Sequence, residues 1–310
     1  GAGRHDPGRR LAAGRRVTQP LPAEQPDSEP ATADGRNTDG WLGELSLGFE
    51  RRGGASVLVH RRHRGPLTVQ RPFYPEGPAV CQVTLLHPPG GVVGGDRLHL
   101  TATLAPDAQA LITTPAAAKV YRSAGPVAAQ RQDLNIAAGA ALEWLPQETI
   151  LFSGARVRSC TRVDLAPGAG FLGWEIACLG RPHCAERFEA GAGTIALELW
   201  ETGEPIFIER GRYAGGGELL AAPWGLAGQP VAGTWLALDP PLELTDRLRA
   251  TLAQVADPAH WGLSRLPRVL VLRYRGPSAA EARALFIHAW TLARPVMLGR
   301  EARPPRIWAT

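Results

Sequence analysis

The sequence predicts a mainly β protein of stacked antiparallel sheets, with two helices near the C-terminus. Three observations support this fold class. After residue 40, apolar residues recur at every second position in several runs, as in strands with one buried face. Turn-forming Pro, Gly and Asp separate these runs at short intervals. Apolar spacings of three and four, typical of helices, appear only late. Short alternating runs of this kind favour antiparallel pairing over βαβ units.

The alternation predicts four strands in particular. The first begins at Trp41, where Leu45, Leu47 and Phe49 share one parity. The other three cover residues 97–104, 156–165 and 195–199. Turn signals between the runs stand at Pro106-Asp107, Ala138-Gly139, Pro167-Gly168 and Thr202-Gly203-Glu204.

Two helices are predicted after residue 240. The first has apolar residues at helical spacing, namely Leu244, Leu248, Leu252 and Val255. The second starts at a capping box formed by Ser278 and Glu281. Its apolar face continues through Ala282, Leu285, Phe286, Ala289 and Ala293. We expect Pro295 to end this helix, because proline lacks the backbone N–H that the next turn needs.

Length and composition indicate one large domain over residues 41–310, preceded by an arm. The chain has 310 residues, 44% of them hydrophobic, which is enough for a well-buried core. Residues 1–40 are rich in Pro, Gly, Ala, Arg and acids. We expect this basic, Pro-rich arm to be disordered, because it has too few large apolar groups to offset its ordering entropy, and we assign it no function.

Charge and targeting signals exclude several classes of protein. The formal charge is +5, but no zinc-finger spacing, RNA-binding aromatic motif or basic helix accompanies it, which disfavours nucleic-acid binding. The chain has no apolar stretch near 18 residues, so no membrane span is predicted. Its basic N-terminus lacks the apolar run of a signal peptide. The four cysteines form no Cys-x-x-Cys pair. Together these features predict a cytoplasmic protein with reduced thiols.

The most unusual segment runs from His87 to Asp96 and reads HPPGGVVGGD. Its four glycines permit positive φ angles and close approach of other groups. It is not a phosphate-binding loop, because it lacks the terminal Gly-Lys-Ser/Thr and precedes a strand. A tight turn closed by the Asp96 carboxylate is the structural alternative to a functional loop.

Two further sets of residues are candidate metal ligands. Asp96, Glu175 and Glu209 are acids in otherwise apolar, strand-like surroundings; such acids are paired, exposed or kept for a cation. Pairing of these acids with Arg181 or Arg210 is the alternative. The second set, Cys178, His183 and Cys184, combines two soft ligands with an imidazole; here the alternative is a buried Cys178 beside an exposed loop. No hydrolase motif such as Gly-x-Ser-x-Gly or His-Glu-x-x-His occurs.

Several segments together resemble the UreD (also called UreH) family of urease accessory proteins. They occur in family order over about residues 41–310: GPLTVQRPFYPE at 65–76, LLHPPGGVVGGD at 85–96, KVYRS at 119–123, LEWLPQE at 142–148, LGRP at 179–182 and PRIWAT at 305–310. The likeness has two departures. Ala118 stands where the family commonly has Ser or Thr, and His183, Cys184 and Ala185 follow the LGRP segment where the family often has a small residue and then Gly.

The resemblance implies a β-rich chaperone that is not an enzyme and holds no tightly bound cofactor. Family members bind apo-urease and UreF, recruit the GTPase UreG through UreF, and help deliver nickel to urease. A homodimer within that accessory complex is compatible with this role. A transfer path needs weak ligands that admit a cation without trapping it, so the resemblance implies Asp96, Glu175 and Glu209 as a transient nickel route. The cluster of Cys178, His183 and Cys184 is a second candidate holding point.

Partner contacts are expected at two places. Lys119, Tyr121 and Arg122 are a candidate docking patch for an acidic partner, although a sheet-edge turn explains them equally well. Residues 282–310 are a candidate contact for UreF. Two other functions stay open: a β-scaffold binding module of another system, which needs clustered exposed aromatic residues, and a small-molecule enzyme that uses the Gly-rich loop.

Overall fold

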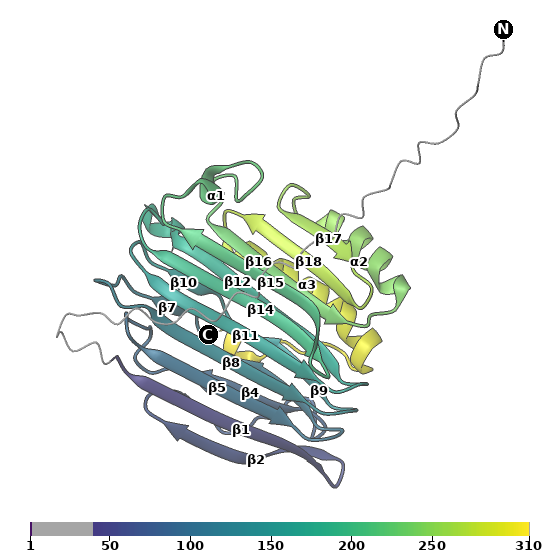
Figure 1. Cartoon of the computed structure of the whole chain (residues 1–310). Coiled ribbons are helices and arrows are strands. Elements are labelled where there is room, and N and C mark those ends of the chain that lie inside the picture. Colours follow the sequence, from purple (N-terminus) through teal and green to yellow (C-terminus); the bar gives the residue numbers. More distant parts are fainter. Residues whose placement is uncertain (2–39, 310) are drawn as a thin grey trace. The chain divides into compact units, whose positions relative to one another are not determined.

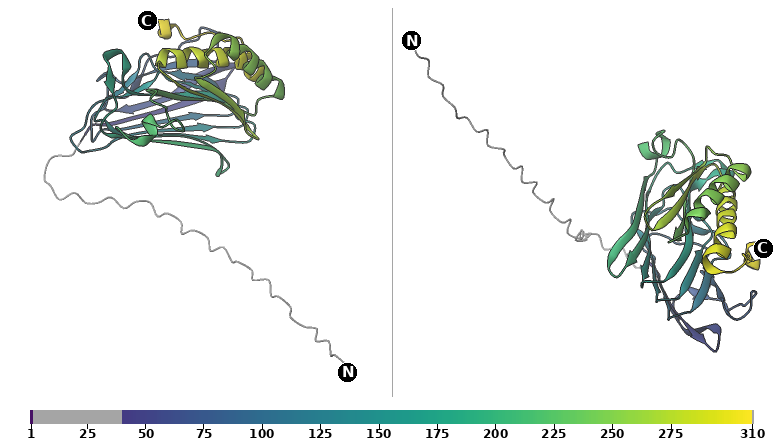
Figure 2. Two further views of the ribbon diagram at one scale, coloured as in Figure 1. Left: turned by 90° about the horizontal axis from the view of Figure 1, so that it is seen from above. Right: turned by 90° about the vertical axis from the view of Figure 1, so that its right-hand side faces the viewer.

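Two β-sheets lie face to face, and the longer helices cover only one of them (Figures 1 and 2). The computed structural model describes residue 1 and residues 40–309, and the predicted disordered arm therefore falls almost entirely outside the described residues. The described part from residue 40 onward lies within one compact unit, Thr38–Thr310. It is mainly β, as predicted.

The first sheet has seven strands in the order β15-β14-β11-β8-β5-β1-β2. Their bounds are β1 (Leu42–Arg52), β2 (Ala55–Arg64), β5 (Arg97–Leu104), β8 (Ala128–Ile136), β11 (Arg156–Leu165), β14 (Ala192–Glu201) and β15 (Glu204–Ala214). The predicted strands at 97–104 and 156–165 match β5 and β11 residue for residue. The other two predicted strands lie within β1 and β14, except for Trp41.

The second sheet has eleven strands, with β17-β18-β16-β12-β9-β6-β4-β3 as its main path. Their bounds are β3 (Thr68–Val69), β4 (Cys81–Leu86), β6 (Gln109–Thr113), β7 (Ala118–Val120), β9 (Ala141–Leu145), β10 (Thr149–Leu151), β12 (Gly170–Arg181), β13 (Glu186–Arg187), β16 (Val231–Leu238), β17 (Trp261–Arg265) and β18 (Val269–Gly276). The short strands β7, β10 and β13 lie beside the main path.

The prediction of antiparallel sheets was wrong for the middle of both sheets. Strands β1, β5, β8, β11 and β14 run parallel to one another, as do β4, β6, β9 and β12. The chain crosses to the other sheet after β5, β8 and β11, so neighbours within one sheet are not consecutive in sequence. Alternation reports which face of a strand is buried, but it does not report which strand lies beside it. Antiparallel pairs occur mainly at the outer strands of each sheet.

Apolar side chains fill both spaces between layers. Two clusters lie between the sheets, one toward the ends of the parallel strands (Leu104, Ile136, Leu165) and one toward their starts (Leu98, Val157). A third cluster lies between the eleven-stranded sheet and helices α2 (Leu242–Val255) and α3 (Ala279–Leu298). Because burial of apolar surface is the main stabilising term in folding, these clusters fix the spacing of the layers.

The two predicted helices are α2 and α3, and one boundary differs. The Ser278 hydroxyl accepts a hydrogen bond from the Glu281 backbone N–H at 3.4 Å, as the capping box predicts. Pro295 does not end α3; the helix continues to Leu298 and closes at Gly299, whose φ is 64°. A proline removes only one intrahelical hydrogen bond, and Met297 and Leu298 still pack against the core beyond it.

Three short helical segments complete the fold: α1 (Glu218–Ala221) and the 3-10 turns η1 (Pro182–Cys184) and η2 (Arg306–Ala309). None of them was predicted.

A buried arginine ties α3 to the sheet and to the loop before β4. The Arg294 guanidinium is fully buried and donates to Glu143 on β9, from Nε at 2.8 Å, and to Glu76 from Nη2 at 2.9 Å. The C-terminal tail then folds back: the Trp308 indole N–H donates to the Thr113 hydroxyl at 2.9 Å, and the Trp308 ring packs near that of Trp290. The tail is therefore part of the core packing.

Candidate functional site

A band of polar side chains crosses the space between the two sheets. At mid-strand, inward-facing positions change from apolar to polar residues, namely Gln130 and Gln132 on β8, Ser159 and Thr161 on β11, Glu175 on β12, Glu209 on β15 and Thr234 on β16. The band lies between the two inter-sheet apolar clusters. Buried polar groups are costly unless they are paired, so this band marks the candidate functional site.

Glu175 lies at the centre of the band. Its Oε1 accepts hydrogen bonds from the Trp144 indole N–H at 2.9 Å and from the Thr161 hydroxyl at 2.7 Å. No arginine pairs with it among the described residues. Burial raises the pKa of Glu175, and the two hydrogen bonds only partly oppose this rise. The second oxygen, Oε2, makes no hydrogen bond within residues 40–309 and keeps accessible surface.

Two cavities meet at Glu175. One, of about 240 Å³, is lined by His87, Lys119, Gln132 and Trp144 among others. The other, of about 290 Å³, is lined by Glu209, Thr234 and Arg273 among others. Glu175 is the one residue that appears in both linings. Its carboxylate therefore stands between two hollows inside the sandwich.

Glu209 lies at the far side of the second cavity. It accepts hydrogen bonds from the Arg273 Nε at 2.7 Å and from the Thr234 hydroxyl. The alternative pairings expected from the sequence do not form, because Arg210 pairs with Glu198 and Arg181 with Glu186. The structure thus brings Glu175 and Glu209 to the same cavity.

Asp96 lies apart from these two acids. It lines neither cavity, and its oxygens accept the backbone N–H groups of Trp41 at 2.8 Å and Val93 at 2.9 Å. Asp96 is buried, at 6% exposed, and these bonds satisfy it locally. This geometry is the turn-closing alternative considered from the sequence.

The glycines before Asp96 serve two different needs. Gly90 and Gly95 have φ angles of 77° and 94°, which glycine adopts readily. Gly91 has room for no side chain, because a Cβ there would lie 2.5 Å from the Tyr121 ring. The loop is joined to β7 by the Val92 N–H, which donates to the Lys119 carbonyl at 2.8 Å. The second and third family-like segments are therefore in direct contact.

His87 was not singled out from the sequence, yet it lines the first cavity. Burial lowers the pKa of His87, and the nearby Asp96 charge partly opposes this. A neutral imidazole is a ligand for divalent transition metals. Thr161, Thr234 and Arg273 were also missed. The two threonines could have been found as polar residues at strand positions where the alternation predicts an apolar, inward-facing side chain.

The soft-ligand set does not converge. Cys178 is buried in the cluster beneath the helices, and burial raises its pKa to about 12. His183 and Cys184 are exposed in η1. Within residues 40–309, no group of three or more His, Cys, Asp or Glu side chains could hold a metal ion.

The proposed docking patch is partly a packing feature. The Tyr121 ring contacts that of Phe152 edge-on, with centroids 5.0 Å apart, and the Arg122 side chain covers Gly154. Lys119 is exposed and lines the first cavity. Contact of this patch with a partner stays a prediction.

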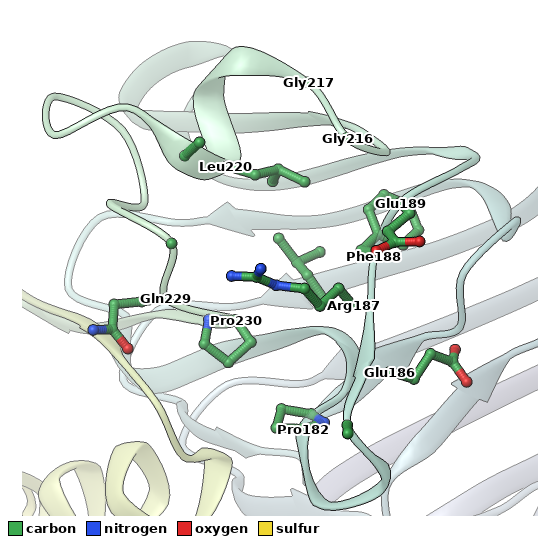
Figure 3. Close-up of a pocket in the computed structure, with 14 residues that line it drawn as sticks. Pro182, Glu186, Arg187, Phe188, Glu189, Gly216, Gly217, Leu220, Gln229 and Pro230 are labelled. Atoms are coloured by element: carbon green, nitrogen blue, oxygen red, sulfur yellow. The ribbon is translucent and has the colours of Figure 1, made fainter.

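A third hollow, of about 600 Å³, lies near η1 and α1 and shares no lining residue with the other two. In Figure 3, the Arg187 side chain extends across it toward Leu220 and Gln229, away from Glu186. The Glu186 carboxylate accepts hydrogen bonds from the Arg181 side chain and from the Ser153 backbone N–H instead. This hollow is separate from the polar band.

No helix among the described residues is long and apolar enough to cross a membrane.

Comparison with known proteins identifies the family. The model of the UreD urease accessory protein family matches residues 42–309. A protein named Urease accessory protein UreD from Dechloromonas aromatica is 47% identical over 297 residues, covering 95% of this chain and 100% of the relative. Relatives of the same name are 48% identical in Pseudomonas fluorescens (88% of this chain, 96% of the relative) and 44% identical in Acaryochloris marina (86% and 95%). The chain therefore belongs to the UreD urease accessory protein family.

Proposed function

We propose that this protein is a non-catalytic, cytoplasmic scaffold for urease maturation. In this proposal it binds apo-urease and UreF, contacts the GTPase UreG through UreF, and helps deliver nickel into the urease active site. Family membership over residues 42–309 supports a role in urease maturation. The partners and the nickel cargo follow from the family resemblance.

The observation that carries the nickel proposal is the position of Glu175 between two cavities. Each cavity has room for several water molecules, since one water occupies about 30 Å³ in the liquid. A hydrated cation can therefore exchange one or two waters for a carboxylate oxygen without leaving a wet environment. The accessible Oε2 of Glu175 is the available ligand.

The two ends of this route differ in chemistry. The first cavity offers the His87 imidazole, and the second offers Glu209, which a cation would share with Arg273. Competition with a guanidinium weakens the hold on a cation, and a transfer path needs weak sites. We therefore assign the route to His87, Glu175 and Glu209. Asp96 is left out, because backbone N–H groups already engage its carboxylate.

The test compares Glu175→Gln and Glu209→Gln with Asp246→Asn, an acid 86% exposed on α2. Each variant is produced together with urease, UreF and UreG, and nickel per urease active site is measured by elemental analysis. We expect the two cavity variants to lower nickel content at least several-fold while UreF and urease still co-purify. Asp246→Asn should match the wild type.

Two outcomes would contradict different parts of the proposal. Full nickel content in both cavity variants would exclude the route but leave the scaffold role intact. Failure of the wild-type protein to co-purify with UreF or urease would contradict the scaffold role itself.

A further inference from the structure

The outer face of the seven-stranded sheet has no covering helix among the described residues. Helices α2 and α3 pack on the opposite sheet, as the two views of Figure 2 show. The outward-facing positions of β5, β8, β11, β14 and β15 therefore form a broad sheet surface. Its side chains alternate with those that face the core.

Three arginines stand in one row across this face. Arg97 on β5 and Arg158 on β11 are both in register with Ala129 on β8. Arg158 and Arg212 on β15 are both in register with Thr194 on β14. Because adjacent strands lie about 4.8 Å apart, successive arginines of the row are about 10 Å apart. We call Arg97, Arg158 and Arg212 the arginine row.

The arginine row is exposed and has no partner in the described part of the chain. None of its three side chains makes a hydrogen bond or ion pair within residues 40–309, and all three are exposed. The positions between them are an alanine and a threonine, so the row contains no acid. Further along the same strands, outward-facing arginines are each bound to a carboxylate: Arg131 to Asp133, Arg162 to Asp164, and Arg210 to Glu198.

The charge on this face therefore differs between the two ends of the parallel strands. Uncompensated positive charge lies at the starts of the parallel strands, and mixed ion pairs follow toward their ends. A surface that only needs solubility does not require this segregation. Guanidinium groups bind carboxylates through two parallel hydrogen bonds, and strands hold them at fixed spacing, which lowers the ordering cost of binding.

The same charge difference argues against nucleic acid. A duplex that follows the strands beyond the arginine row would meet Asp133, Asp164 and Glu198, which repel phosphates. Protein–DNA contacts also commonly neutralise about six to ten phosphates, more than the row offers. A protein surface with an acidic stripe has no such conflict, because its neighbouring residues can be neutral or basic.

We propose that the arginine row docks an acidic stripe on a partner protein of the maturation assembly. The choice of a maturation partner rests on the proposed function; the preference for carboxylates does not. Binding through the row should weaken as salt rises, since exposed charge pairs are screened.

The experiment compares two double charge reversals in the full chain. Arg158→Glu with Arg212→Glu changes the row. Arg247→Glu with Arg249→Glu makes the same change in net charge at two exposed sites on α2, outside the candidate UreF contact. Binding to poly-L-glutamate is measured first, between about 50 and 300 mM salt. We expect the affinity of the wild type for poly-L-glutamate to fall as salt rises. The row variant should bind at least tenfold more weakly than the wild type, and the affinity of the control variant should change less than twofold.

The same three proteins are then tested against apo-urease and against UreF. Tenfold weaker binding of one partner by the row variant alone supports the proposal. Equal losses in both double variants would overturn it, because net charge would then be the cause. Tighter binding of duplex DNA than of poly-L-glutamate by the wild type would also overturn it.

A separate result would contradict only the proposed function. If the wild type binds neither apo-urease nor UreF, the scaffold role fails, and the poly-L-glutamate series still decides whether the row recognises carboxylates. Arg158→Gln with Arg212→Gln keeps the side chains polar, and it should show an intermediate loss if charge is the cause.

Discussion

At the scale of single residues, Glu175 is an acid in an environment that disfavours its charge. It is a carboxyl group between two sheets with hydrogen bonds to one oxygen only and no cationic partner among the described residues. Burial raises its pKa, which means that the folded protein resists its ionisation. Functional groups often reduce stability in this way, so the stability cost itself can be measured.

We predict that Glu175→Gln stabilises the protein at neutral pH. The amide oxygen of glutamine can still accept from Trp144 and Thr161, while the charge is removed. When folding raises the pKa of a carboxyl group, the protein loses stability as the pH rises above the pKa of that group in the unfolded chain, near 4.3. The difference in free energy of unfolding between the variant and the wild type should therefore be small near pH 4. Toward neutral pH it should grow by about 1.4 kcal/mol for each unit by which folding raises the pKa of Glu175. Urea unfolding from pH 4 to 8 measures it.

Glu143→Gln is the contrasting control. The Glu143 carboxylate accepts a hydrogen bond from Nε of the buried Arg294 at 2.8 Å. Replacing this carboxylate with a neutral amide leaves the buried guanidinium without part of its counter-charge, which should destabilise the protein at pH 7. If Glu175→Gln also destabilised the protein at pH 7, the Glu175 carboxylate would be a structural group.

At the scale of elements, the tail after α3 packs back against the helix and the sheet beneath it. The Trp308 ring lies 5.8 Å from that of Trp174 and 6.0 Å from that of Trp290, centroid to centroid. The Arg294 guanidinium also donates to the Glu301 carbonyl and so holds the start of the tail. Removing residues 296–310 would therefore disturb the core as well as any partner contact. Contact of residues 282–310 with UreF stays a prediction that needs surface variants.

We predict that Trp308→Ala lowers the free energy of unfolding by about 2–4 kcal/mol, since it removes a large, half-buried aromatic contact. Val296→Ser is the matched control, because Val296 is on α3 but 44% exposed; it should change stability by less than about 0.5 kcal/mol. Denaturant unfolding of both variants checks this. A Trp308→Ala protein as stable as wild type would show that the tail is not part of the fold.

At the scale of the whole molecule, the chain winds alternately through the two sheets. Strands β5, β8 and β11 of the seven-stranded sheet are each bonded on both sides to strands far away in sequence, and the antiparallel pairs of this sheet lie at its two edges. Edge strands leave half of their backbone groups unpaired. Local opening should therefore begin at the edges.

We predict that backbone amides of β2 exchange with deuterium before those of β8 and β11. Residues Arg61–Arg64 of β2 are exposed, whereas β8 and β11 are each paired on both sides. Hydrogen–deuterium exchange by mass spectrometry would resolve the order. Equal protection across the sheet would contradict it and would mean that the sheet opens as one unit.

Local features were predictable from the sequence because short-range chemistry determines them. The alternation of β5 and β11, the Ser278 cap and the close packing of the Gly-rich loop each depend on a few neighbouring residues. The end of α3 was missed because packing of Met297 and Leu298 outweighs the missing hydrogen bond of Pro295. The acids were chosen by residue type, which could not separate Asp96, held by backbone N–H groups, from Glu175.

The sequence by itself determined the β-rich class, which face of each main strand is buried, and the family, because side-chain periodicity and motif order are written along the chain. Only the tertiary structure decided that strands in the middle of both sheets run parallel, that Glu175 stands between two cavities, and that three arginines with no partner within residues 40–309 share one row. The physical reason is that each of these features joins residues from strands remote in sequence, and a period of two does not specify which strands become neighbours.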